Sequence, residues 1–503
     1  MDRYLWRGNE TLDIISKAHQ KAQEDIQAAV DRIYAKMGKS YGLSKDEITK
    51  LLNEPAGRDE YERLLQEIST IMNATARKAL EARASSGAYA YRVSRLDALK
   101  DHVRAQTARL ADVELSSVTS HLRGIITDAY NRSMFDLQRG TGYGFSFAQM
   151  DTRTVNEILH NPWSGSNFSQ RIWKAQDMLA KQLNEKLTAG FMSGRSNTQL
   201  SRELSDTMGV SFRNAERLVR TETNYMANAA EMRSYIEASI DKYEFMSTLD
   251  KRTSEVCQDL DGQVFLVKDA MPGKNMPPMH PHCRSTTVAR FDDDALEGMQ
   301  RRSKDPITGE NVLVPRGMKY NDWLKMQEDT YGPERVELAI KMQANLSKDQ
   351  KQYSDHLDQL GKMNVPDTFA KFQEMKYNGG EDWETFKAYS NAVIAGDISA
   401  LTGLDHYKTV VEDVKTNLVG LTTSEGIKIK GFVYHYIDRT IGSYEQSREG
   451  VSVLDARYAL IKPVNVKNTV RASGKSSALY IGGNCAVTVN PDTGYLIQTN
   501  PRR

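Results

Sequence analysis

Apolar residues recur at steps of three, four and seven positions through most of the first 240 residues, which predicts long amphipathic helices that pack against one another. The first apolar stripe consists of Ile15, Ala22, Ile26, Val30, Ile33 and Met37. Gly38 is expected to end that helix, because glycine is the usual residue just past a helix C-terminus. A capping-box pattern at Ser44 and Glu47 predicts a second helix, which should end before Pro55.

Further helices are predicted along the same part of the chain. One should begin near Arg58, and a long one should run from about residue 93 to 138, where Gly140 is expected to break it. A shorter helix is predicted over 198–208, with its end at Gly209.

A group of charged and amide residues follows on a stretch rich in helix formers. Its members are Arg217, Arg220, Glu222 and Asn224. Such a group is typical of a solvated helix face with pairs four residues apart. The alternative is a buried polar network between packed helices.

The pattern changes after residue 240. Residues 242–250 alternate between polar and apolar positions, which predicts a short strand. Residues 296–375 are polar and carry several Pro and Gly residues early on, so we interpret them as a connector with one or two helices.

The last 120 residues predict helices followed by strands. Helices are expected over 383–394 and 405–414, and Ser452 with Asp455 forms an N-cap pattern for a helix that stops at Pro463. Patterns rich in β-branched residues predict strands at 464–470, 478–483, 486–490 and 495–499. The turn sequence NPDTG should join the last two strands into an antiparallel pair.

These patterns predict a chain that is mainly α in its N-terminal two thirds, with long helices and a small Cys/His knuckle, followed by an α+β domain with a terminal antiparallel sheet. The expected parts are a helical region at 1–160, a helical core at 161–295 whose end (241–295) is the knuckle, a connector at 296–375 and the α+β domain at 376–503.

Composition narrows the function classes. Lys and Arg total 67 and Asp and Glu total 66, which argues against nucleic-acid binding through overall charge and leaves a local basic face open. We expect no secretory signal and no membrane anchor, because the N-terminus lacks an apolar region and no run of about 18 apolar residues exists. Three cysteines in 503 residues make a disulfide scaffold improbable and fit a reducing compartment.

Two of the three cysteines lie between residues 257 and 285 with two histidines. The candidate ligands are Cys257, His280, His282 and Cys283. Thiolates and imidazoles drawn from two short clusters joined by a loop are typical of a structural zinc site, and their softness favours zinc over magnesium or calcium. The alternative is a metal-free loop in which the histidines make ordinary hydrogen bonds.

Five sequence elements in a fixed order resemble the phage head morphogenesis family, the minor head proteins to which phage Mu protein F belongs. They are W-S-G-S-N-F-S-Q-R-I at 163–172, L-V-R-T-E-T-N at 218–224, L-D-K-R-T-S-E-V-C at 249–257, L-D-G-Q-V-F at 260–265 and P-P-M-H-P-H-C-R-S at 277–285. The resemblance implies a virion protein inside the head near the portal, made in the host cytoplasm, that acts in head assembly and in DNA packaging or ejection. Its partners would be the portal, other head proteins and packaged DNA.

One position departs from that family pattern. The family motif commonly ends in Cys-Arg-Cys, and here Ser285 replaces the last cysteine. The fourth ligand to zinc would then be His282 or a carboxylate such as Asp261. A catalytic zinc with an open position would need a general base, and none stands out.

Residues 425–503 resemble a second family, the phage-borne nuclease domains of the barnase, EndoU, colicin and RelE superfamily, which are metal-independent ribonucleases when active. RNA cleavage without metal needs a base, an acid and cations for the phosphate. His435 suits proton transfer, and Arg439 should share its helical face. Arg448 and Lys430 could bind phosphate, and Thr499 could orient it. The alternative is that these residues only pair with neighbours such as Asp438.

Three functions therefore compete: a portal-associated head protein, a packaged effector whose C-terminal domain cuts host RNA, and a DNA-binding protein of the head. An ADP-ribosyltransferase activity, found beside this head family, is set aside because no glutamate-rich catalytic loop is apparent.

Overall fold

The structure is a computed structural model that describes residues 1–37, 45–85, 92–141, 150–290, 298–443, 446–470 and 476–502. The helix stop predicted at Gly38 and the cap predicted at Ser44 lie outside the described residues. The chain forms two compact units, Met1–Thr330 and Tyr331–Arg503. The boundaries predicted at 160, 295 and 375 stay a prediction.

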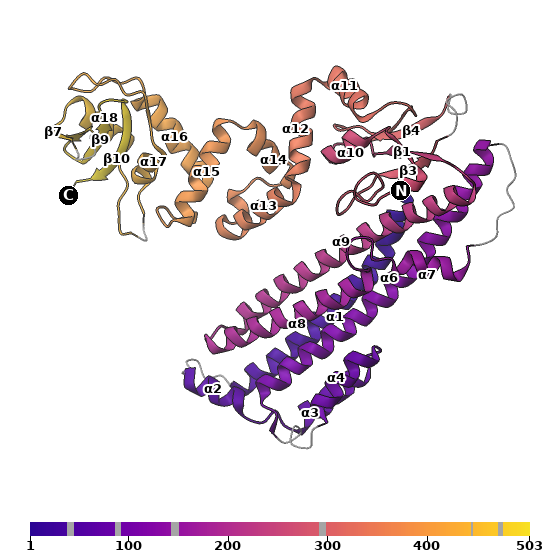
Figure 1. The fold of residues 1–503 in the computed structure, drawn as a ribbon. Helices are drawn as coiled ribbons and strands as arrows, with labels where there is room; N and C mark the ends of the chain where they lie inside the picture. The colour runs from indigo at the N-terminus through magenta and orange to yellow at the C-terminus, as the bar shows by residue number, and fades with distance from the viewer. Residues whose placement is uncertain are drawn as a thin grey trace. The chain divides into compact units, whose positions relative to one another are not determined.

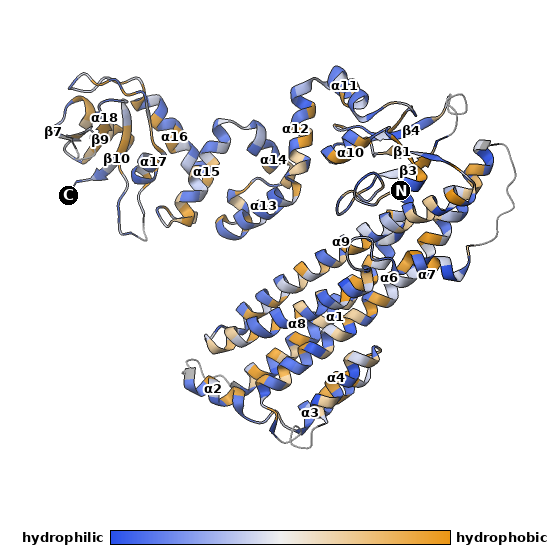
Figure 2. Ribbon diagram, viewed as in Figure 1, coloured by the Kyte–Doolittle hydropathy of each residue, from blue (hydrophilic) through white to orange (hydrophobic). Residues whose placement is uncertain are grey.

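Four long helices form the body of the first unit. They are α1 (Asp2–Met37), α6 (Arg95–Thr141), α8 (Phe168–Met192) and α9 (Asn197–Glu237), and they lie side by side (Figure 1). The apolar stripe predicted for the first helix packs inward, with Ile15, Ile26 and Val30 fully buried. Figure 2 shows hydrophobic and hydrophilic positions alternating along each of these helices, as amphipathic helices require.

Shorter helices surround this bundle. They are α2 (Lys45–Asn53), α3 (Arg58–Ser69), α4 (Ala74–Ala84) and α7 (Thr152–His160). Helix α2 ends before Pro55 and α3 begins at Arg58, as predicted. The predicted break at Gly140 is displaced slightly, because α6 continues to Thr141.

The predicted end of a helix at Gly209 is wrong, because α9 runs unbroken from Asn197 to Glu237. Its buried positions continue at helical spacing on both sides of this glycine, from Leu204 and Met208 to Ala215 and Val219. Packing of that continuous stripe outweighs the roughly 1 kcal/mol that glycine costs in a helix.

The knuckle is built on a three-stranded antiparallel sheet of order β2-β1-β3. Strand β1 (Lys242–Met246) confirms the strand predicted there and pairs with β2 (Val264–Leu266) and β3 (Thr286–Ala289). A short helix, α10 (Glu255–Leu260), and the turn η1 (Val267–Asp269) complete it.

The prediction of one or two helices over 296–375 is wrong. This stretch holds a hairpin of β4 (Gln300–Lys304) and β5 (Asn311–Pro315), and then four helices begin within it: α11 (Tyr320–Tyr331), α12 (Pro333–Ala344), α13 (Leu346–Leu360) and α14 (Phe369–Asn378). Helix α12 buries only Val336, so its sequence shows almost no apolar stripe.

The second unit continues with helices around a five-stranded sheet. Its other helices are α15 (Glu381–Ile394), α16 (Leu404–Leu418), α17 (Tyr434–Ile441) and α18 (Val453–Ile461), with the turns η3 (Lys362–Asn364) and η4 (Ala400–Thr402). The sheet has the order β6-β10-β9-β8-β7, antiparallel except for the β6–β10 pair. Its strands are β6 (Gly431–Phe432), β7 (Asn465–Val470), β8 (Ser476–Ile481), β9 (Cys485–Asn490) and β10 (Tyr495–Pro501).

The predicted fold class is confirmed: long helices form most of the N-terminal part, and the C-terminal domain ends in an antiparallel sheet. The side chain of Ser452 accepts a hydrogen bond from the backbone of Asp455, as the cap pattern before α18 predicted. Among the described residues, no helix is long and apolar enough to cross a membrane.

Candidate functional site

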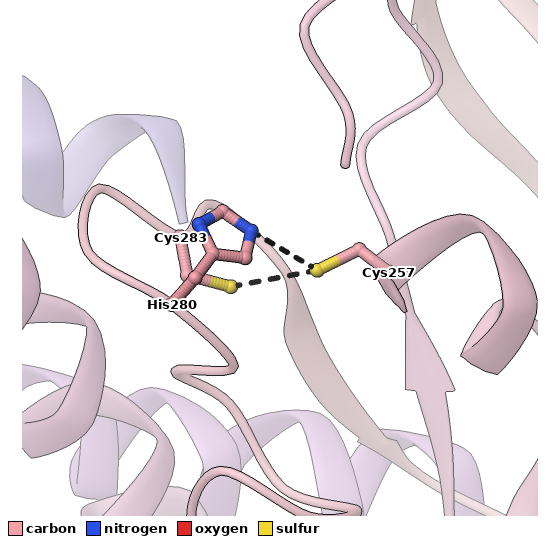
Figure 3. Close-up of side chains that lie close together, drawn as sticks. All are labelled: Cys257, His280 and Cys283. Atoms are coloured by element: carbon pink, nitrogen blue, oxygen red, sulfur yellow. Dashed lines mark hydrogen bonds between the residues drawn. The ribbon is translucent and has the colours of Figure 1, made fainter. Parts of the chain in front are cut away.

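The thiol and imidazole groups of the knuckle converge at one point (Figure 3). Cys257 comes from α10, and His280 and Cys283 come from the loop that enters β3. The Sγ atoms of the two cysteines lie 3.8 Å apart, and Sγ of Cys257 lies 3.4 Å from Nε2 of His280. These ligand atoms all lie within 4.8 Å of one another. The loop therefore brings three of the four predicted ligands together.

These separations match a tetrahedral zinc centre. With Zn–S bonds near 2.3 Å and Zn–N bonds near 2.05 Å, tetrahedral geometry places two sulfurs about 3.8 Å apart and a sulfur and a nitrogen roughly 3.6 Å apart. The distances between the thiols of Cys257 and Cys283, and between Cys257 and His280, are within a few tenths of an ångström of these values. Two of the three separations in the cluster are thus compatible with a zinc centre.

The protonation of the two thiols also suits a metal. A hydrogen bond from Cys283 lowers the pKa of Cys257. Burial opposes this effect, and Ser254, Ser285 and Arg284 lower the pKa further. The neighbouring Cys257 and burial raise the pKa of Cys283. The thiol of Cys257 therefore ionises first, and its thiolate accepts a hydrogen bond from the thiol of Cys283. A dication bound between the two sulfurs would release that remaining proton.

Neither candidate for the fourth ligand, His282 or Asp261, belongs to the three-residue cluster. Asp261 is buried and accepts hydrogen bonds from Arg301, the amide of Ser247 and the amide of Tyr320, so its carboxylate is already engaged. His282 is exposed and lies outside the three-residue cluster, although it lines a cavity of about 20 Å³ beside Cys257. That volume admits one water molecule.

An ion pair fixes the loop that carries the ligands. Arg284 donates to both carboxylate oxygens of the buried Asp250, one of them at 2.7 Å. Burial alone would raise the pKa of Asp250, but Arg284 lowers it below its usual value. The side chain of Ser254 bonds Nε2 of His280 at 2.8 Å. Sequence reasoning missed Asp250, Ser254 and Arg284 as partners, although all three lie inside the motifs of the family resemblance.

The polar group on α9 proves to be a buried network for two of its members. Glu222 is fully buried and accepts from Arg171 at 2.6 Å and from the indole of Trp163 at 3.0 Å. Asn224, also fully buried, donates to the backbone carbonyl of Ser285 at 2.9 Å. The interpretation as a solvated face is wrong for these two residues, because Glu222 ties α9 to Trp163 and α8 and Asn224 joins α9 to the knuckle.

The proposed nuclease residues are only partly brought together. His435 and Arg439 lie on α17, and Nε of Arg439 donates to Nε2 of His435 at 3.3 Å. Arg448 approaches the same place, where its Nη2 donates to the carbonyls of Asp397 and Asp438.

Two members of that set lie elsewhere. Thr499 is fully buried in β10, and its hydroxyl donates to the carbonyl of Ala486. Lys430 is exposed, and its amide pairs with Gly494 at the β9–β10 turn.

Acidic neighbours of His435 were missed as parts of a site. The carboxylates of Asp397 and Asp438 lie with the His435 ring within 4.8 Å of one another. Tyr407 donates to Asp438 at 2.9 Å, and burial raises the pKa of that carboxyl to about 6. Asp438 follows His435 by three residues, a helical spacing that could have indicated the contact. Asp397 comes from a distant loop and carries no such signal.

The first unit is a bundle of long helices that ends in a small Cys/His knuckle. Residues 181–288, from the second half of α8 through most of β3, match the family described as Phage Mu protein F like protein. This match supports the resemblance to the phage head morphogenesis family.

A curated relative and the solved structures complete the comparison. The chain is 22% identical over 273 residues to the NAD(+)–arginine ADP-ribosyltransferase EFV of Enterococcus faecalis, covering 49% of this chain and 55% of that protein. The chain thus spans about half the length of the curated relative it matches. No solved structure matches the chain.

Proposed function

We propose that this chain is a minor head protein that sits inside the phage head at the portal vertex and takes part in head assembly and in DNA packaging and ejection. The observation that supports this best is the position of the family match. Residues 181–288 contain the end of the bundle, the link from Asn224 to Ser285 and all three clustered ligands. The matched stretch is thus one connected structure rather than scattered motifs.

Zinc has a structural role in this proposal. Cys257, His280 and Cys283 would hold it, with water or His282 in the fourth position. The ion would tie α10 to the loop before β3 and keep both on the end of α9. No reaction is assigned to it, because the surrounding side chains serve to hold the loop.

A groove on the first unit offers a surface for docking on the portal. It has a volume of about 720 Å³ and lies between α8, α9 and the loop before Pro281. Met178 and Val210 line it and are about half exposed, so the groove presents apolar side chains to the solvent. Lys174 and Arg217 add positive charge to its lining, whereas Arg171 is paired with Glu222.

The docking proposal is tested by co-purification. The full chain, co-expressed with the portal and capsid proteins of its phage, should carry the portal protein through two affinity steps. Val210→Asp should weaken that association at least tenfold, because it places a charge in the groove. Leu313→Asp, on the exposed face of β5, is the matched control and should bind normally. Equal binding by both variants would remove the groove from the interface, and no binding by the native chain would contradict portal docking.

The cluster at His435 favours a second function, a packaged effector whose C-terminal domain is a metal-independent ribonuclease acting on host RNA. His435, Arg439 and Arg448 supply a base and two cations in one place. The purified full chain should degrade RNA in the presence of a chelator, and His435→Ala should abolish this. His406→Ala, an exposed histidine of the same unit, should leave it intact. RNA left intact by the native chain would contradict this function.

The relative from Enterococcus faecalis provides a competing activity for the same assay. Transfer of labelled ADP-ribose from NAD⁺ to arginine by the full chain, without RNA cleavage, would replace the ribonuclease proposal with the activity in that relative's name.

A further inference from the structure

The hydrogen bond between Arg439 and His435 occupies the nitrogen that a catalytic base would use. A guanidinium N–H can only donate, so Nε2 of His435 must be the acceptor at 3.3 Å. The ring hydrogen then resides on Nδ1. In this state His435 cannot take a proton at Nε2 until Arg439 moves away.

The guanidinium group of Arg439 is held by few contacts and can turn toward another acceptor. It is half-buried, and in the described part of the chain its two terminal nitrogens have no protein partner. Arg448, by contrast, is anchored through the carbonyls of Asp397 and Asp438 and through the side-chain oxygen of Gln446. One guanidinium is therefore fixed and the other is free to turn, as a clamp for an anion requires.

The charges around His435 come from four elements. Arg439 and Asp438 belong to α17, Asp397 follows α15, Arg448 comes from the segment before α18, and Tyr407 of α16 donates to Asp438. Burial, Arg439 and Arg448 lower the pKa of His435, whereas Asp397 raises it. Below about pH 6, where Asp438 is protonated, two guanidinium groups face the single carboxylate of Asp397, so the surroundings of His435 then carry a net positive charge.

We propose that Arg439 and Arg448 form a phosphate-binding site, and that a bound phosphate group replaces His435 as the acceptor of the Arg439 N–H and so frees Nε2 of His435. The ligand class is a phosphate mono- or diester. His435 then gains its proton affinity only when the anion is present, with Asp397 placed to stabilise the imidazolium. This inference deepens the proposed ribonuclease activity and rests on it for the natural substrate, but its test needs no catalysis.

A divalent metal is the competing occupant. The donor atoms of Asp397, His435 and Asp438 lie close enough to share one ion. Two adjacent guanidinium groups oppose a dication there, and Tyr407 already uses one oxygen of Asp438. The geometry therefore favours an anion.

The test follows the titration of His435 by NMR in the full chain, labelled with ¹³C at the histidine Cε1 position. Its resonance is assigned by its loss in His435→Gln. Sulfate serves as the probe, because its charge is constant between pH 5 and 9, and sodium chloride of equal ionic strength is the reference. Sulfate should raise the proton affinity of His435 about tenfold, which is about one pKa unit.

Variants separate the clamp from general electrostatics. Arg439→Gln should raise the pKa of His435 without sulfate and abolish the sulfate response, whereas Lys467→Gln, an exposed cation of β7, should behave as the native chain. An unchanged His435 pKa in sulfate, or an equal response in Arg439→Gln, would overturn the proposal. So would Mn²⁺ broadening the His435 resonance at micromolar concentration. A normal sulfate response in a chain that leaves RNA intact would refute only the ribonuclease function.

Discussion

Ser285 stands where a further thiolate would complete the ligand set of the knuckle. Its side chain is buried, and its hydrogen bond lowers the pKa of Cys257, so the position already faces the cluster. Ser285→Cys should raise zinc affinity at least tenfold, because a third thiolate replaces a weaker fourth ligand. Competition with a chromophoric chelator measures this affinity.

Removal of a ligand gives the reciprocal result. Cys257→Ser should reduce bound zinc from about one ion per chain to near zero by elemental analysis. Cys485→Ala, at the buried cysteine of the second unit, is the control and should keep its zinc. Full zinc occupancy in Cys257→Ser would contradict the site.

Glu114 gives a residue-scale prediction about pH. Burial raises its pKa to about 8 from an ordinary 4.5, against the effect of a hydrogen bond from Gln176. The folded state therefore keeps the proton up to about pH 8, whereas the unfolded chain loses it near pH 4.5. The stability from this group is complete below pH 4.5 and is lost as the pH rises to about 8, a change of a few kcal/mol.

Urea denaturation followed by tryptophan fluorescence checks this. Glu114→Gln keeps a hydrogen-bonding amide in place and should flatten the fall in unfolding free energy between pH 5 and 8. The same slope in the native chain and the variant would contradict a buried, protonated Glu114.

Sequence reasoning identified single residues well where chemistry marks them, and poorly where their partners come from elsewhere. The meeting of Cys257, His280 and Cys283 was predictable, because thiols and imidazoles are rare in this sequence and these three lie close together along it. The fourth ligand was not predictable, because the occupation of Asp261 by Arg301 depends on a hairpin 40 residues later.

At the scale of elements, two helical glycines have opposite surroundings. A Cβ at Gly209 in α9 would come no closer than 3.6 Å to the flexible side chain of Arg213, whereas one at Gly190 in α8 would lie 2.2 Å from the buried Leu200. Gly209→Ala should therefore stabilise the first unit by about 0.5–1 kcal/mol. Gly190→Ala should destabilise it by about 1–3 kcal/mol, because the two helices would be forced apart.

Urea denaturation distinguishes these effects by opposite shifts of the midpoint. A stabilising Gly190→Ala would contradict the close contact of α8 and α9. The pair also explains the error made at Gly209: a glycine in the sequence does not reveal whether it ends a helix or lies inside one. Helix existence was predictable from apolar spacing, but this boundary depended on packing.

At the scale of the whole molecule, the two units present different chemistry. The first joins the bundle to the knuckle through Asn224, and it contains both the Cys/His cluster and the stretch that matches the family described as Phage Mu protein F like protein. The second carries the acid, base and cations around His435 on a terminal α+β fold. Net charge and composition only narrowed the function classes, whereas the order of five short motifs indicated the resemblance to the phage head morphogenesis family.

The most direct test of the account is protease protection of the chain in purified phage particles. If it is a minor head protein, mass spectrometry should find it in few copies per intact particle, protected from added protease and exposed once the particle is opened. Its absence from purified particles, or its digestion while the heads remain closed, would contradict a head-interior protein.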